Sequence, residues 1–194
     1  MPTSVGKQQS SRKSKAKCKH SKRPHVRVDA VRIDLDAQDI RQCQALANER
    51  IRKYGREHRP YNGTLTPEKL IRINRLGVMG ELAVAAYLDV PYSWECNYTP
   101  TSKDDDVQGI QVRSTDYGNG HLITHPDDTH APYVLVTLAI TGPMRVTASL
   151  QGWAPLDECN IWDHWRTDIP YPAYMTPQTA LHPMSTLTIK AGST

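Results

Sequence analysis

The sequence predicts an α/β protein with helices in its first half and strands in its second half. Apolar side chains recur at helical intervals between residues 36 and 57, and an almost uncharged apolar segment covers residues 76–88. After Pro91 the pattern changes to short alternating runs separated by Gly, Pro, Asp and Asn. With 194 residues, 38% of them hydrophobic, the chain is long enough to bury a core of this kind.

Residues 1–27 are expected to form a disordered basic arm, followed by one domain over residues 28–194. The arm is rich in Lys, Arg and Ser and nearly free of large apolar side chains, so burial cannot offset the entropy of ordering it. Residues 1–32 hold ten Lys or Arg and one acidic residue, whereas residues 76–194 hold five Lys or Arg and thirteen Asp or Glu. This asymmetry favours a basic front that meets a polyanion, although charge runs are usually solvated surface.

Two helices are predicted before the strands. The first follows Asp36, which would cap it together with Asp39, and runs to about residue 57. The second begins after Thr66, with Pro67 in the first helical position, and runs to about residue 88, with or without a break at Gly77. The basic side chains on the outer face of the first helix, which could follow a phosphate backbone or simply be solvated, are Arg41, Arg50, Arg52, Lys53 and Arg56.

Five short segments after the helices are expected to be strands of one sheet. They cover residues 92–98, 109–115, 121–124, 133–140 and 145–153. In the second of them, alternation places Ile110 and Val112 on one face and Gln111, Arg113 and Thr115 on the other.

Two features suggest chemistry at the junction of helices and strands. Glu81 is the only charged side chain in segment 76–88, and a buried carboxylate needs solvent, an arginine or a functional partner. Three consecutive acids at 104–106 stand just before the strand that carries Gln111 and Arg113. Carboxylate and amide oxygens suit hard divalent cations such as Mg²⁺, although an Asp cluster before a strand is usually a solvated turn.

Other functional classes have less support. His121 and His125 could offer a general base, but their Gly, Asn, Pro and Asp neighbours are typical of turns. The sequence holds no phosphate-binding loop, dinucleotide fingerprint or serine-hydrolase motif. No apolar run reaches the length of a membrane span, no secretory apolar region follows the start, and the four cysteines form no C-x-x-C pair, so we expect a cytoplasmic, reducing location.

Two ordered motifs, G-E-L-A-V-A at residues 80–85 and D-V-x-G-x-Q-V-R at residues 106–113, resemble the PD-(D/E)XK nuclease superfamily, in particular its small phage-encoded members of uncertain role. The likeness continues through Y-V-L-V, G-W and the closing P-Q-T-A-L, and so spans about residues 31–187. It implies a restriction-endonuclease-like central mixed sheet flanked by helices.

The resemblance also implies roles for individual residues. Asp106, Gln111 and the main-chain carbonyl of Val112 would hold Mg²⁺ or Mn²⁺, with Glu81 in the same site or directly behind it. The metal would activate water and neutralise charge on a phosphodiester. Gln111 stands where most members have Asp or Glu, which lowers the charge available to the metal. Arg113 replaces the usual Lys; it can stabilise charge but, with a pKa above roughly 12, cannot act as a base.

The sequence therefore predicts a magnesium-dependent DNA phosphodiester hydrolase, phage-encoded and active in the host cytoplasm, with a homodimer as one candidate assembly. Two alternatives stay open: a catalytically degenerate DNA-binding protein with the nuclease fold, and a structural or assembly protein of a phage particle. The predicted phosphate contacts are Lys13, Lys15, Lys17, Lys19, Lys22, Arg23, Arg52, Lys53 and Arg56.

Overall fold

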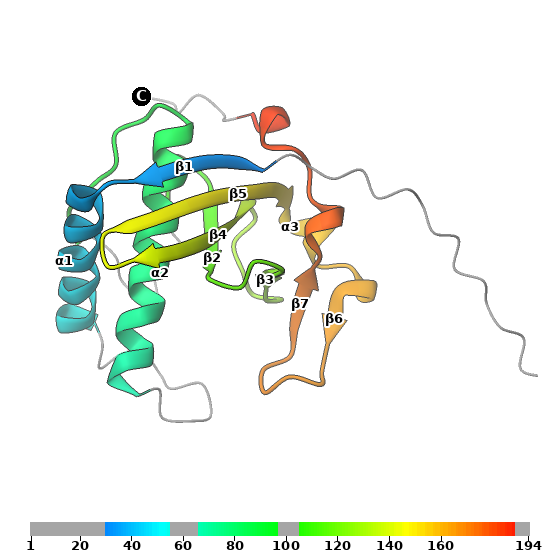
Figure 1. The fold of residues 1–194 in the computed structure, drawn as a ribbon. Coiled ribbons are helices and arrows are strands. Elements are labelled where there is room, and N and C mark those ends of the chain that lie inside the picture. The colour runs from blue at the N-terminus through cyan, green and yellow to red at the C-terminus, as the bar shows by residue number, and fades with distance from the viewer. Residues whose placement is uncertain (1–29, 55–65, 97–104, 189–194) are drawn as a thin grey trace, which may run out of the picture.

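The computed structural model describes residues 30–54, 66–96 and 105–188, and Figure 1 shows their arrangement. The expected basic arm and Arg56 lie outside the described residues. The described part is a mixed α/β structure in which a four-stranded sheet packs against two long helices, with a smaller three-stranded sheet beside it.

The first helix, α1 (Ala37–Tyr54), begins where its sequence signal predicts. The Asp36 carboxylate accepts hydrogen bonds from the N–H groups of Gln38 at 2.6 Å and Asp39 at 2.8 Å. In return the Asp39 carboxylate accepts the Asp36 N–H at 3.0 Å. This reciprocal cap satisfies N–H groups that have no partner within the helix, and it fixes the start of α1.

The second helix, α2 (Pro67–Tyr87), is continuous through Gly77. Thr66 caps it by accepting the Lys69 N–H at 3.4 Å, and Pro67 occupies the first turn, as predicted. Gly80 lets α2 approach the sheet closely, because a Cβ atom there would lie 1.8 Å from the Oγ of Ser114. The glycine therefore sets how near Glu81, its neighbour, comes to the sheet.

The four-stranded sheet has the order β1-β5-β4-β2. Strand β2 (Gln111–Thr115) runs parallel to β4 (Pro132–Gly142), and β5 (Arg145–Pro155) is antiparallel to both β4 and β1 (Val31–Leu35). In the β2–β4 register Gln111 lies opposite Tyr133 and Arg113 opposite Leu135. Strands β2, β4 and β5 confirm the sequence prediction, whereas β1 was not predicted.

Two predictions about the strands were wrong. The predicted strands do not form one sheet, because β3 (Leu122–Thr124) pairs with β7 (Ala173–Thr176), which pairs with β6 (Trp165–Arg166), in a separate sheet. Residues 92–96 form no strand. Their Tyr92 instead turns its hydroxyl to Glu81, which leaves the segment as a loop against α2. Residues 97 and 98 lie outside the described part.

The segment after β5 contains short helices only. These are α3 (Leu156–Cys159) and the 3₁₀ turns η1 (Trp162–His164), η2 (Gln178–Ala180) and η3 (Met184–Thr186). Its end is fixed to β5 by two main-chain hydrogen bonds between Trp153 and His182, at 3.0 and 2.8 Å.

Buried side chains form one cluster on each face of the four-stranded sheet. In β4, Val134 and Val136 belong to the cluster that includes both long helices, whereas Tyr133 and Leu135 belong to the one that includes α3 and β3. Burial of each of these aliphatic side chains stabilises the folded state by roughly 1.5–3 kcal/mol relative to leaving it exposed. Since α1 and α2 both contribute to the first of these clusters, the two long helices cover the same face of the sheet. None of the described helices is long and apolar enough to cross a membrane.

Candidate active site

Asp106 is held against the start of β2 by a tight turn. Val107 and Ile110 exchange main-chain hydrogen bonds of 3.1 and 2.9 Å around Gln108 and Gly109, whose φ angles are 48° and 82°. Two successive positive φ angles are typical of a type I′ turn, where glycine is favoured. The chain thus doubles back, and the Asp106 carboxylate accepts the N–H of Val112 at 2.7 Å.

The Asp106 carboxyl has an unusual electrostatic environment. Its pKa is raised from 3.8 to about 6, first because burial disfavours the charged form and then because the carboxylate of Glu81 is near. The Val112 N–H and the guanidinium groups of Arg113 and Arg50 act in the opposite direction but do not compensate fully. Burial therefore destabilises the charged form of Asp106, and a cation bound to the carboxylate would stabilise that form.

Glu81 is neutralised by a partner from the first helix. Both carboxylate oxygens accept hydrogen bonds from Arg50, each at 2.8 Å, and the side chains are 14% and 8% exposed for Arg50 and Glu81. The Tyr92 hydroxyl donates a further bond of 2.7 Å to Oε2. The placement of Arg50 on the outer face of α1 was thus wrong, and Glu81 takes the alternative in which it pairs with an arginine.

The pKa shifts of Arg50 and Tyr92 keep both groups as donors. Burial disfavours the charge on Arg50, but its hydrogen bonds to Glu81 outweigh that effect and raise its pKa. The pKa of Tyr92 is also raised, by burial and by the charge on Glu81. The result is a fixed Arg50–Glu81–Tyr92 cluster linking α1, α2 and the loop after α2.

Arg113 is oriented by Asp128 and by Tyr133, whose ring lies on the face of the sheet opposite the two long helices. Its Nη2 donates to the Asp128 carboxylate at 3.2 Å, and the guanidinium lies 5.0 Å from the ring centroid of Tyr133. Its Nη1 is 3.5 Å from the carbonyl oxygen of Val112. Asp128 is itself held by the His125 N–H at 3.0 Å. The guanidinium is therefore pre-positioned next to the main-chain carbonyl expected to face a metal.

Asp106 and the first two residues of β2 offer oxygen donors of the kind that hard divalent cations prefer. Asp106 offers a carboxylate, the 8% exposed Gln111 an amide and Val112 a carbonyl, all of them oxygen ligands of the kind that Mg²⁺ accepts. Among the described residues, no group of three or more His, Cys, Asp and Glu side chains could hold a metal. With Glu81 paired to Arg50, the negative charge of this donor set comes from Asp106.

Two predicted phosphate contacts are described. The Arg52 side chain is 75% exposed, and its nearest acidic oxygen, on Glu49, is 4.0 Å away. Lys53 has closer partners within the protein, because its Nζ lies 3.0 Å from the Glu49 carboxylate and donates a hydrogen bond of 3.4 Å to the Cys96 carbonyl. Arg52 thus remains available to a polyanion, and Lys53 fixes the end of α1 to the loop that follows α2, at Cys96.

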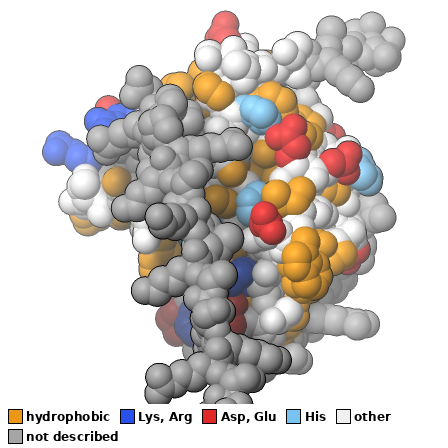
Figure 2. Space-filling view, turned by 90° about the vertical axis from the view of Figure 1, so that its right-hand side faces the viewer, with side chains coloured by type: hydrophobic (Ala, Val, Ile, Leu, Met, Phe, Trp, Pro, Cys, Tyr) orange, Lys and Arg blue, Asp and Glu red, His pale blue; other side chains and the backbone are white. Residues whose placement is uncertain are grey.

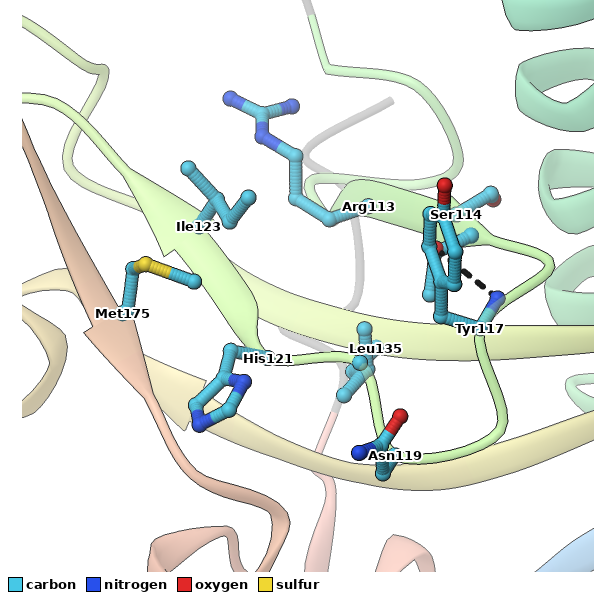
Figure 3. Close-up of a pocket in the computed structure, with 10 residues that line it drawn as sticks. Arg113, Ser114, Tyr117, Asn119, His121, Ile123, Leu135 and Met175 are labelled. Carbon is cyan, nitrogen blue, oxygen red and sulfur yellow. Dashed lines mark hydrogen bonds between the residues drawn. The ribbon is translucent and has the colours of Figure 1, made fainter. Parts of the chain in front are cut away.

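A pocket of about 480 Å³ opens beside Arg113 (Figure 3). Its walls come from β2, from the loop between β2 and β3, and from β3, β4 and β7. Figure 2 looks at the end of the molecule that carries β6 and β7, where apolar, acidic and histidine side chains are intermixed. His121, considered as a base from the sequence, lines this pocket.

No family model, curated protein or solved structure matches the chain. Sequence reasoning missed four residues that shape the site: Arg50 as the partner of Glu81, Tyr92 as its donor, and Asp128 and Tyr133 as the supports of Arg113. A lone acid in an apolar helix indicates a buried cationic partner, but the sequence alone cannot show which of the four basic residues of α1 supplies it.

Proposed function

We propose that the chain is a magnesium-dependent DNA phosphodiester hydrolase whose centre is Asp106, and that its sheet and helices form a restriction-endonuclease-like core of the PD-(D/E)XK type. The observation that carries the proposal is the turn that returns Asp106 to the start of β2. This turn brings a buried carboxylate to the N–H of Val112, the second residue of β2, whose first residue is Gln111 and whose Val112 carbonyl accepts a hydrogen bond from Arg113.

Asp106, Gln111 and the Val112 carbonyl would hold the cation. When bound, Mg²⁺ would supply a lowered pKa for the attacking water and positive charge against the developing phosphorane. Since Glu81 already pairs with Arg50, it would act behind the site, by fixing α2 next to Asp106. A single free carboxylate predicts weak magnesium binding without DNA and tighter binding with it, because a substrate phosphate adds oxygen ligands.

Arg113 would stabilise charge on the scissile phosphate. Its contacts to Asp128 and Tyr133 leave the guanidinium oriented before substrate arrives, so little ordering is needed on binding. Arginine stays protonated at any working pH, so its role is electrostatic; the attacking water, its pKa lowered when the metal is bound, would lose its proton to bulk solvent. Arg52 would contact the backbone further along the DNA, together with the arm.

The proposal is tested by cleavage of circular, single-stranded and branched DNA with Mg²⁺, by the wild type and by Asp106→Asn. The asparagine keeps an oxygen that can accept the Val112 N–H but removes the charge, so cleavage should fall by more than the roughly 10- to 100-fold that loss of an outer partner of a metal ligand costs. The matched control is Asp163→Asn on η1, which removes an equal charge from an exposed position and should cleave like the wild type. Cleavage by Asp106→Asn at the rate of the Asp163→Asn control and the wild type would refute the proposed centre.

One observation favours a second candidate, a DNA-binding protein without turnover. Glu81 is fully engaged by Arg50 and Tyr92, and Gln111 brings no charge, so a single carboxylate must hold the cation. This candidate predicts that DNA binding by Asp106→Asn equals that of the wild type and that neither protein cleaves in Mg²⁺ or Mn²⁺.

A further inference from the structure

The loop between β2 and β3 carries an exposed aromatic ring on a fixed backbone. Tyr117 is 65% exposed. Its neighbour Asp116 forms an ion pair with Arg72 of α2, and the Gln178 side-chain amide donates to the carbonyls of Gly118 at 2.9 Å and Gly120 at 3.0 Å. The loop is therefore anchored from both α2 and η2, although its aromatic side chain contributes little to any core.

The packing of the loop against β2 adds to this rigidity. The Tyr117 N–H donates to the Thr115 hydroxyl at 3.2 Å, and the Gly120 N–H to the Tyr117 carbonyl at 2.9 Å. Gly120 lies so close to β2 that a Cβ atom there would be 2.4 Å from the Cγ2 of Thr115. A ring held this way can receive a flat ligand without a large ordering cost.

The pocket next to this ring has the composition of a site for a flat, partly polar group. Figure 3 shows Tyr117 on the opposite side of the pocket from Ile123 and Met175, with Arg113 at one end and Asn119 at the other. Ile123 is 39% exposed, and Leu135 forms an apolar wall. A volume of about 480 Å³ lies in the range of small-molecule sites, which combine apolar walls with a few polar groups.

From this geometry we infer that the pocket takes one unpaired nucleobase of a DNA strand, stacked on Tyr117, with its polar edge toward Asn119 and His121 and its phosphate toward Arg113. Arg113 belongs to both the pocket and the proposed centre, so the base that enters would be adjacent to the scissile phosphate. A base inside a duplex would first have to be flipped out, at a cost of a few kcal/mol, so the favoured substrate class is DNA with unpaired nucleotides: single strands, flaps or bulges. The inference rests on the proposed function for the role of the neighbouring phosphate.

The test is binding without metal, so that it does not depend on cleavage. Single-stranded and bulged oligonucleotides carrying 2-aminopurine at the unpaired position are titrated in EDTA, and the quenching of that base and the dissociation constant are recorded. The wild type should quench 2-aminopurine and prefer both probes over a fully paired duplex.

Three variants locate the effect. Tyr117→Ala should weaken binding roughly 5- to 150-fold, the loss of one base–aromatic stack, and abolish quenching. Tyr117→Phe should keep the quenching. Trp162→Ala, which removes an 81% exposed aromatic outside the pocket, should behave as the wild type. Thermal unfolding of each variant shows that the fold is retained.

The outcomes separate this inference from the proposed function. Unchanged binding and quenching by Tyr117→Ala would overturn the pocket, even if Asp106→Asn still abolishes cleavage. Competition by a free deoxynucleoside monophosphate at the same concentration as the oligonucleotide would overturn the assignment to a strand. Loss of stacking in Tyr117→Ala in a protein that cleaves no DNA would support the pocket and refute the nuclease.

Discussion

Replacing Arg50 by methionine tests whether the buried ion pair holds α1, α2 and the site together. The substitution leaves the Glu81 carboxylate, with a side chain only 8% exposed, against a thioether and a single hydroxyl donor, Tyr92. Removing one partner of a buried pair costs about 3–5 kcal/mol, because the remaining charge has no compensation. For a domain of this size, each kcal/mol lowers Tm by roughly 2–4 °C, so we expect a fall of about 6–20 °C.

Urea unfolding of a double-mutant cycle gives the assay. Glu81→Met should also destabilise the fold, because it leaves Arg50 buried without its carboxylate. The double variant should be more stable than Arg50→Met alone, because replacing both charges by apolar groups removes the uncompensated charge. Arg52→Met is the control: its side chain is 75% exposed, so the change should stay within about 0.5 kcal/mol.

Two results would refute this reasoning. A cost below about 1 kcal/mol for Arg50→Met would mean that the carboxylate is solvated and the pair contributes as a surface pair does. Strict additivity of the two single substitutions would mean that the side chains act independently, contrary to the two hydrogen bonds of 2.8 Å between them.

Three further predictions concern the helix–sheet contact, the metal ligands and the arm. Gly80→Ala should destabilise the fold by about 1–3 kcal/mol in urea unfolding, since the added Cβ meets the Oγ of Ser114. In a Ser114→Ala background the same change should cost much less, because the hydroxyl that it meets is gone; that hydroxyl is buried and finds no partner among the described residues. Gln111→Glu should strengthen magnesium binding in titration calorimetry, because it adds a second carboxylate beside Asp106, and unchanged affinity would argue against Gln111 as a ligand. Deleting residues 1–27 should flatten the dependence of log Kd for DNA on log salt concentration, with a slope change of about 0.9 per lost phosphate contact, and an unchanged slope would show that the arm makes none.

Local signals in the sequence predicted the elements that depend on local chemistry. The reciprocal cap at Asp36 and Asp39 and the Thr66-Pro67 start fixed both helices to within a few residues, because the hydrogen bonds that begin a helix involve residues two to four apart. The strand signals of β4 and β5 were equally readable, because β4 is a continuous apolar run buried on both faces and β5 alternates between buried and partly exposed residues.

Features that depend on contacts between distant segments were not predictable. Arg50 and Arg52 look alike in the sequence of α1, and the position of α2 decides which of them is buried. The second sheet consists of strands of two to four residues, too short for a reliable alternation signal. The supports of Arg113 are Tyr133, which the parallel pairing of β2 with β4 brings near, and Asp128, which lies in the turn before β4.

The most direct test of the central claim is calorimetric titration of Mg²⁺ and Mn²⁺ into the wild type and Asp106→Asn, at several pH values and in the presence of a non-cleavable DNA analogue. Because the raised pKa of Asp106 means that the proton must leave before a cation binds, affinity should be halved near pH 6, approach its full value about one pH unit above, and fall about tenfold per pH unit well below. We expect this pH dependence of metal affinity in the wild type and no specific metal binding in Asp106→Asn. Equal binding by the two proteins, or binding that does not change between pH 7 and pH 5, would contradict Asp106 as the metal-holding carboxylate.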